Sequence, residues 1–406
     1  MTNRRLARRA EERDVTDQPL FDTLLREIPS PYYRPEHRGF RETLRKWVEA
    51  EIVPHVDEWD EAGGFPRELY AKAADIGLLR LGFPEAYGGI EDTDLFHMII
   101  ATEELARAGS GGLIASLMSH GIGAPPIVAL GSDEMKARVL PAILNGEKIS
   151  ALAITEPSGG SDVANLKTTA RREGDDYIVN GEKVFITSGI RADYITTAVR
   201  TGGKGFGGIS LLLIDTSLPG ITRTPLKKMG WWMSDTAAIH FDEVRVPAAN
   251  LIGPENAGFL GIVRNFNGER IALAAGANAF ARVALEEALG WARQRMTFGK
   301  RLADHQVIRH KIVDMAQRVH ATQSMLENLA WRIEQGDAPI AEICMLKNQA
   351  TTTMEFCARE AMQILGGAGY MRGVKTERIY REVRVNAIGG GSEEIMRDLA
   401  ARQLGL

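Results

Sequence analysis

The middle of the chain, residues 149–250, differs in pattern from the segments on either side of it. β-branched residues that alternate with turn-forming residues are typical of short strands. The Asn180-Gly181 pair favours a tight hairpin turn between two of these strands. The pattern predicts an antiparallel β domain, either a barrel or a sandwich. The strands are expected in the segments rich in Ile, Val and Thr: residues 167–172, 177–180, 183–186, 194–200, 209–215 and 237–246.

Both flanks of this β region carry helical patterns. Phe40, Leu44, Trp47 and Val48 follow one apolar stripe, which is the spacing of an amphipathic helix. A helical–β–helical order indicates an α+β protein rather than a chain of alternating βαβ units. Helices are predicted over residues 68–79, 95–108 and 133–144 before the β region, and over 307–334, 340–365 and 393–404 after it.

The 406-residue chain is too long for a single core, because cores stop growing at about 250–300 residues. We expect a flexible arm over residues 1–35 and an N-terminal helical domain over 36–148. The middle β domain is expected over residues 149–252, and a C-terminal four-helix bundle over 253–406. Many small residues in the last segment favour close packing of helices.

The composition excludes several classes of function. A net charge of −4 gives no reason to expect nucleic acid or an anionic membrane as partner. No apolar run reaches the roughly 18 residues of a membrane-spanning helix. Cys344 and Cys357 fit neither a disulfide framework nor a metal site, so we predict no metal and a reducing, cytoplasmic compartment. The arginine-rich start argues only weakly for mitochondrial import, because acidic residues follow it and serine is lacking.

Residues 152–162, Leu-Ala-Ile-Thr-Glu-Pro-Ser-Gly-Gly-Ser-Asp, join the end of a strand to a loop of small residues. Pro157 cannot donate to a strand ladder and should end the strand. Gly159 and Gly160 allow backbone amides to approach a ligand closely. Ser161 and Asp162 add side chains that can form hydrogen bonds. The pattern indicates either a ligand-holding loop or a plain turn.

These eleven residues resemble the flavin-contacting signature of the acyl-CoA dehydrogenase family. The resemblance extends over about residues 37–406. Phe185-Ile186-Thr187 is similar to the family segment that lies against the isoalloxazine ring, where an aromatic face and a hydroxyl donor suit the flavin. Taken alone, these residues would be an ordinary strand Phe beside a turn Thr.

Two further segments resemble family motifs near the flavin phosphates. Residues 295–300, Arg-Met-Thr-Phe-Gly-Lys, are similar to an Arg-x-x-Phe-Gly segment in which Arg295 would pair with the pyrophosphate. Residues 363–367, Gln-Ile-Leu-Gly-Gly, resemble a segment that reaches the FAD of a neighbouring subunit. Without the resemblance they would be a basic helix end and a helix C-cap. The resemblance implies FAD held by Leu152, Ala153, Ile154, Thr155, Gly160, Ser161, Phe185, Ile186, Thr187, Arg295, Thr297, Phe298, His305, Gln306, Gln363, Ile364, Gly366, Gly367, Ser392 and Glu394.

The resemblance implies a catalytic base at a position different from that of many family members. Many family members carry a glutamate near the C-terminus, but here the corresponding position is Gly390, which cannot take a proton. Members that resemble the long-chain and isovaleryl-CoA enzymes carry the base on an upstream helix instead. Residues 265–270, Asn-Phe-Asn-Gly-Glu-Arg, match that segment and place Glu269 at the base position. Otherwise Glu269 would be an acid on a helix surface. Desolvation should raise its pKa.

The resemblance implies FAD-dependent conversion of an acyl-CoA to a trans-2-enoyl-CoA, with an electron-transferring flavoprotein as acceptor and a homotetramer as the assembly. Ser161, Arg270 and Gly390 are expected to contact the substrate. The glycines at 389–391 remove side-chain bulk, so we expect a medium or long, branched or otherwise wide acyl group. Two alternatives remain open: a flavin oxidase on the same fold, and a non-catalytic subunit that binds flavin or CoA esters.

Overall fold

The structure is a computed structural model that describes residues 30–406, apart from the side chains of residues 260 and 263–266. Of the predicted flexible arm, residues 1–29 lie outside this described part. The residues that follow are packed: Tyr32 stacks on Phe96 with ring centroids 6.0 Å apart, and Tyr33 contacts the same ring edge-on.

The N-terminal part is helical, as predicted. Polar side chains fix where its helices begin: the Ser132 hydroxyl accepts a hydrogen bond from the Met135 amide at 3.2 Å and starts a helix that ends at Leu144, the predicted range. The helices are α3 (Pro35–Glu51), α4 (Val56–Ala62), α5 (Glu68–Asp75), α6 (Leu95–Ala106), α7 (Gly111–Leu117), α8 (His120–Gly123), α9 (Pro125–Leu130) and α10 (Asp133–Leu144).

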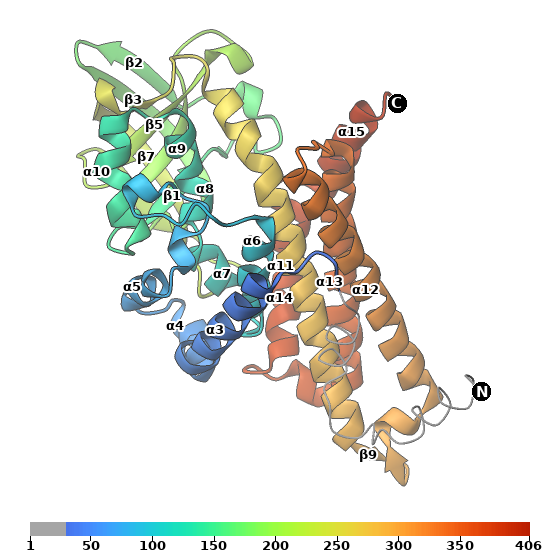
Figure 1. Ribbon diagram of the computed structural model, residues 1–406. Coiled ribbons are helices and arrows are strands. Elements are labelled where there is room, and N and C mark those ends of the chain that lie inside the picture. The colour runs from blue at the N-terminus through green and yellow to red at the C-terminus, as the bar shows by residue number, and fades with distance from the viewer. Residues whose placement is uncertain (1–29) are drawn as a thin grey trace.

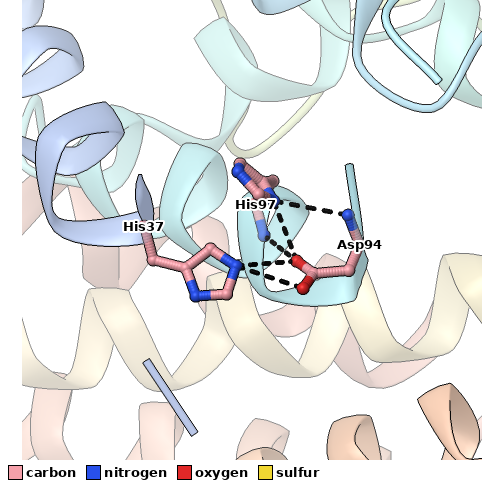
Figure 2. Close-up of side chains that lie close together, drawn as sticks. All are labelled: His37, Asp94 and His97. Atoms are coloured by element: carbon pink, nitrogen blue, oxygen red, sulfur yellow. Dashed lines mark hydrogen bonds and ion pairs between the residues drawn. The ribbon is translucent and has the colours of Figure 1, made fainter. Parts of the chain in front are cut away.

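Two histidines and an aspartate join the starts of α3 and α6 (Figure 2). Their ligand-type atoms lie within 4.8 Å of one another, a spacing that a metal ion could use. However, His37 Nδ1 accepts the Arg34 amide at 3.0 Å, so its Nε2 carries the hydrogen and donates to Asp94 at 3.0 Å. His97 Nδ1 contacts the same carboxylate at 2.8 Å, and Arg34 Nη2 lies 3.1 Å from it. These hydrogen bonds explain why the three residues lie together, because they cap the first turns of α3 and α6.

The middle part is one eight-stranded sheet in the order β6-β7-β3-β2-β4-β5-β8, with β1 beside β4 (Figure 1). It is mixed rather than wholly antiparallel, because β1 and β4 run parallel and Thr169 pairs in parallel with Arg200. No hairpin joins β1 to β4, so chain geometry does not force them antiparallel. With β6 and β8 at its ends, the described sheet is open, not a closed barrel. Its strands are β1 (Ser150–Ala153), β2 (Thr169–Glu173), β3 (Asp176–Thr187), β4 (Tyr194–Arg200), β5 (Ile209–Asp215), β6 (Ile221–Pro225), β7 (Thr236–Pro247) and β8 (Leu251–Ile252).

The predicted hairpin at Asn180-Gly181 is wrong. Both residues lie inside the single long strand β3, and the turn before it is at Gly174 and Asp175. Gly181 has φ +142°, and a Cβ there would lie 2.6 Å from Thr168 Cα. The β3–β7 register also shifts at this point, as in a β-bulge. The glycine therefore serves a close backbone contact, not a turn.

The C-terminal part forms the predicted helical bundle. Its longest helix runs from the sheet to the far end of the bundle, where the short β9–β10 hairpin lies (Figure 1). Small buried residues such as Ala274, Ala277 and Ala281 allow the neighbouring helices to approach it closely. The elements are α11 (Gly258–Gln294), β9 (Met296–Thr297), β10 (Lys300–Arg301), α12 (Gln306–Glu334), α13 (Ile340–Leu365), α14 (Lys375–Ile388) and α15 (Glu393–Gln403).

No single described helix combines the length and apolarity needed to cross a bilayer. A bent pair, Gly111–Leu117 with His120–Leu130, meets both criteria together, with 52° between its halves.

Candidate active site

The loop that follows β1 lies directly against β3. The Thr155 carbonyl accepts the Val184 amide at 2.9 Å, which fixes the loop next to residues 185–187. The structure therefore brings together two segments that the sequence predicts to contact the flavin. Leu152, Ile154 and Thr155 are half-buried, whereas Gly160 and Ser161 are exposed.

A buried ion pair anchors this loop, and the sequence analysis missed it. Lys183 Nζ lies 2.8 Å from Glu156 Oε1 and donates to the Ile154 carbonyl at 3.0 Å. Glu156 also accepts the amides of Lys167 and Thr168 at 2.5 and 2.9 Å. Burial would raise the pKa of Glu156, but Lys183 and these hydrogen bonds outweigh it and lower that pKa. Burial lowers the pKa of Lys183 to about 8 in spite of its partner. The signal in the sequence was a lysine at an inward-facing strand position.

Phe185 has an unusual conformation for a strand residue. Its φ is +61°, a region that non-glycine residues seldom adopt, and its side chain is 68% exposed. The next residue, Ile186, is buried. A strained backbone that presents an aromatic ring to solvent is typical of a ligand site.

Glu269 projects from α11 toward the glycine turn at 389–391. A Cβ on Gly390 would lie 3.7 Å from Glu269 Oε1 and 2.4 Å from Leu273 Cδ1. Burial raises the pKa of Glu269, and the positive charges of Arg270 and Lys347 act against that rise. The carboxylate thus lies within van der Waals distance of the first side-chain atom that position 390 would carry.

Arg270 connects the same helix to the same turn. Its side chain is buried, its Nε donates to the Gly390 carbonyl at 3.4 Å, and its Nη1 donates to Asn267 Oδ1 at 3.1 Å. Lys347 on α13 donates to the next carbonyl, that of Gly391, at 2.7 Å. The structure therefore gathers Glu269, Arg270 and Gly390, three of the proposed site residues, and it adds Lys347, which the sequence analysis did not single out.

Ser392 and Glu394 begin α15, just beyond this turn. The Ser392 hydroxyl caps the helix by accepting the Ile395 amide at 3.4 Å. Glu394 is exposed, and hydrogen bonds to its own amide and to Ser392 lower its pKa. Their predicted contact with FAD stays a prediction.

The remaining predicted cofactor residues lie at the opposite end of the bundle (Figure 1). Arg295 directly follows α11, so it is roughly 39 Å from Glu269 along the helix axis at 1.5 Å per residue. Phe298, at the tip of the β9–β10 hairpin, is 97% exposed. An ion pair between Lys311 and Glu360 joins the first turns of α12 to the last turns of α13. One flavin therefore cannot contact Glu269 and Arg295 of the same chain.

The far-end residues nevertheless have features that suit a dinucleotide. Thr297 Oγ1 lies 3.0 Å from His305 Nε2, and Arg295 is an exposed cation beside them. Gly366 has φ +60°, and a Cβ at Gly366 or Gly367 would meet no described atom within 4 Å. An open glycine backbone, a cation and an exposed aromatic ring form a suitable donor set for phosphate and adenine. The residues at both ends of the bundle thus fit parts of FAD.

Family models match almost the whole described chain. The acyl-CoA dehydrogenase N-terminal domain matches residues 34–147, the middle domain matches 151–244, and the C-terminal domain matches 256–405.

Individual relatives agree with these matches. Acyl-CoA dehydrogenase apdG of Emericella nidulans is 38% identical over 94% of this chain and 93% of its own length. The mitochondrial long-chain specific acyl-CoA dehydrogenase of Sus scrofa is 35% identical over 91% of this chain and 86% of its own. The crystal structure of a probable acyl-CoA dehydrogenase from Mycobacterium abscessus is 47% identical, covers 92% of this chain and 100% of its own, and superposes with a TM-score of 0.90.

The cofactor follows from the same relationship. Glutaryl-CoA dehydrogenase from Mycobacterium smegmatis, solved in complex with FADH2, is 26% identical and has a TM-score of 0.86 over 92% of this chain and 96% of its own. The predicted fold, the oxidoreductase class and FAD as cofactor are confirmed. This chain is an FAD-binding oxidoreductase that belongs to the acyl-CoA dehydrogenase family.

Proposed function

We propose that this protein converts an acyl-CoA thioester to the trans-2-enoyl-CoA, with Glu269 as the base that removes the α-proton. The observation that carries the assignment is the proximity of the Glu269 carboxylate to Gly390. Position 390 is where many family members carry the base. A carboxylate that enters the same space from α11 can serve the same α-carbon.

Residues of this chain prepare the proton transfer in three ways. Burial raises the pKa of Glu269, which makes the carboxylate a stronger base at neutral pH. Arg270 and Lys347 counter that rise, so that the ionised form persists. The Glu156–Lys183 pair holds the loop whose Ser161 we expect beside the substrate. FAD, when bound, supplies the acceptor for the β-hydrogen.

The acyl group is proposed to be long, branched or alicyclic. Gly389, Gly390 and Gly391 contribute no side-chain volume to the turn beside Glu269. Among the relatives, cyclohexane-1-carbonyl-CoA dehydrogenase of Geobacter metallireducens is 35% identical over 91% of this chain. Its name indicates a bulky ring as acyl group, which supports a wide pocket here.

An anaerobic titration with a panel of acyl-CoA esters tests the proposed reaction and its substrate class. We expect long, branched or alicyclic esters to bleach the flavin absorbance at lower concentration than butyryl-CoA. A clear preference for short straight chains would contradict the proposed pocket. No bleaching with any ester would contradict the reaction itself and favour the non-catalytic alternative. Hydrogen peroxide formed in air without an added acceptor would favour the oxidase.

We further propose a cytoplasmic homotetramer in which each flavin site is completed by a second subunit. The separation of Glu269 from Arg295 within one chain supports this assembly. An electron-transferring flavoprotein is the proposed electron acceptor. A solved structure described as the electron transferring flavoprotein of Acidaminococcus fermentans is 31% identical to this chain, with a TM-score of 0.88.

Replacing Phe298 by Ala should weaken FAD binding without destabilising the subunit fold. The ring is 97% exposed, so its removal leaves the bundle core intact. Loss of one aromatic contact should raise the dissociation constant of FAD about threefold to tenfold. Flavin fluorescence titration measures the affinity, and light scattering measures the assembly. Leu406→Ala, which removes another side chain that is 90% exposed, is the control and should behave as wild type. Unchanged FAD affinity in Phe298→Ala would contradict a shared flavin site.

A further inference from the structure

Lys347 is a lysine enclosed in the bundle on the buried face of α13. Its side chain is 0% exposed, and its neighbours one turn away on the same face, Cys344 and Thr351, are buried as well. Lysines are almost never buried this completely unless they are paired. Within the described residues Lys347 forms no ion pair, and its Nζ donates instead to the Gly391 carbonyl at 2.7 Å. The hydrogen-bond partner of this buried lysine is therefore a neutral carbonyl and not a carboxylate.

The titratable groups around Lys347 belong to the candidate active site or lie beside it. They are Glu269 and Arg270 on α11, Glu393 at the start of α15, and the Cys344 thiol on its own helix. Burial, together with Arg270, lowers the pKa of Lys347 to about 8, while the two carboxylates and the thiol oppose this. The ammonium form still predominates at neutral pH. In return, Lys347 is one of two cations that act against the rise in the pKa of Glu269.

Lys347 and Arg270 hold two consecutive carbonyls of the glycine turn from two different helices. Arg270 donates to Gly390 at 3.4 Å, and Lys347 donates to Gly391 at 2.7 Å. Both glycines have positive φ, +64° and +105°. A Cβ at Gly391 would lie 2.4 Å from Met396 Cε, so the turn depends on glycine and has little intrinsic stiffness. Two charge-assisted hydrogen bonds fix a segment that would otherwise be free to move.

We propose that Lys347 is a positioning residue for the proton transfer: it fixes the Gly390–Gly391 turn beside Glu269 and supplies a buried positive charge that keeps Glu269 ionised. This inference rests on the proposed function. In the reaction, the α C–H bond breaks, the proton goes to a Glu269 oxygen, and the electron pair of that bond forms the α,β double bond. The β-hydrogen leaves as hydride with its own electron pair, and FAD, when bound, would be the two-electron acceptor. Lys347 neither gains nor loses a proton. The alternative is a lysine that only satisfies the Gly391 carbonyl and stabilises the bundle.

Three variants separate the charge from the hydrogen bond. Lys347→Met removes both, Lys347→Gln retains a donor without charge, and Lys347→Arg retains both. The measurement is the pH profile of kcat/KM with the best acyl-CoA of the panel. We expect the acid limb to move to higher pH in the Met and Gln variants, because loss of the cation makes Glu269 harder to ionise. It should stay in place in the Arg variant. At neutral pH, the Met variant should lose about 100-fold in kcat and the Gln variant less, because a displaced turn misplaces the reacting atoms.

The FAD content of each purified variant shows whether it has folded. If the Met variant fails to fold, the comparison of Gln with Arg decides the question. An acid limb in the Gln variant that coincides with wild type would overturn the role of the charge. If acyl-CoA bleaches the wild-type flavin but the acid limb of the Gln variant does not shift, this inference is wrong and the proposed function stands. If no acyl-CoA reduces the wild-type flavin, the proposed function itself is wrong.

Discussion

Replacing Glu269 by Gln is expected to lower the rate of flavin reduction by acyl-CoA by about 10²- to 10⁴-fold, the usual contribution of a positioned general base. Gln has nearly the same shape as Glu but cannot accept the α-proton. The half-buried side chain should keep its place beside the glycine turn. FAD binding and acyl-CoA binding should therefore persist while the chemical step fails. Stopped-flow absorbance of the flavin under anaerobic conditions measures this step directly.

Asp398→Asn is the matched control for this experiment. Asp398 lies on α15, beyond the glycine turn, where its side chain is exposed and pairs with Arg402 at 2.7 Å. Its replacement should leave the rate within about twofold of wild type, since exposed charges contribute little. A Glu269→Gln rate within about twofold of wild type would show that the base has been assigned to the wrong residue.

The pattern of apolar residues was sufficient to predict the organisation of the chain. Helices α10 and α13 have the predicted bounds, because a polar cap or a proline starts each one and its buried stripe has helical spacing. The Asn180-Gly181 hairpin failed for a tertiary reason. Gly181 is required by the backbone of Thr168, a contact that no local rule contains.

The candidate site shows the same division between local and long-range information. Glu269 and Arg270 could be found because they form one motif on one helix. The Glu156–Lys183 pair spans 27 residues, and Lys347 and Gly391 are 44 residues apart. Sequence spacing alone carries no information on such contacts, since they form only when α13 packs beside the glycine turn and β3 beside the loop. The sequence shows no more than a lysine at a position where the spacing of the neighbouring apolar residues predicts a buried side chain.

Replacing Lys183 by Met is expected to lower the free energy of unfolding by about 3–5 kcal/mol, the cost of removing one partner from a buried ion pair. Glu156 would keep the amides of Lys167 and Thr168 but lose its only described ion-pair partner in a site that excludes water. The Ile154 carbonyl would lose a donor as well. Because these groups fix the loop that follows β1, the variant should also release FAD more readily. Chemical denaturation measures the stability, and flavin retained after gel filtration measures the binding.

The double variant Glu156→Gln/Lys183→Met distinguishes a buried charge from a simple loss of packing. If the unpaired carboxylate causes the instability, neutralising it should recover part of the lost free energy. Pure loss of packing predicts that the two substitutions add, or that the double variant is worse. Glu182→Gln is the control, because Glu182 precedes Lys183 in β3 but its side chain is exposed and lies 3.5 Å from His240 at the surface. If the free energy of unfolding of Lys183→Met lies within about 1 kcal/mol of wild type, the ion pair does not hold the loop. The loop would then be held by its backbone hydrogen bonds, among them the Thr155–Val184 contact beside the flavin site.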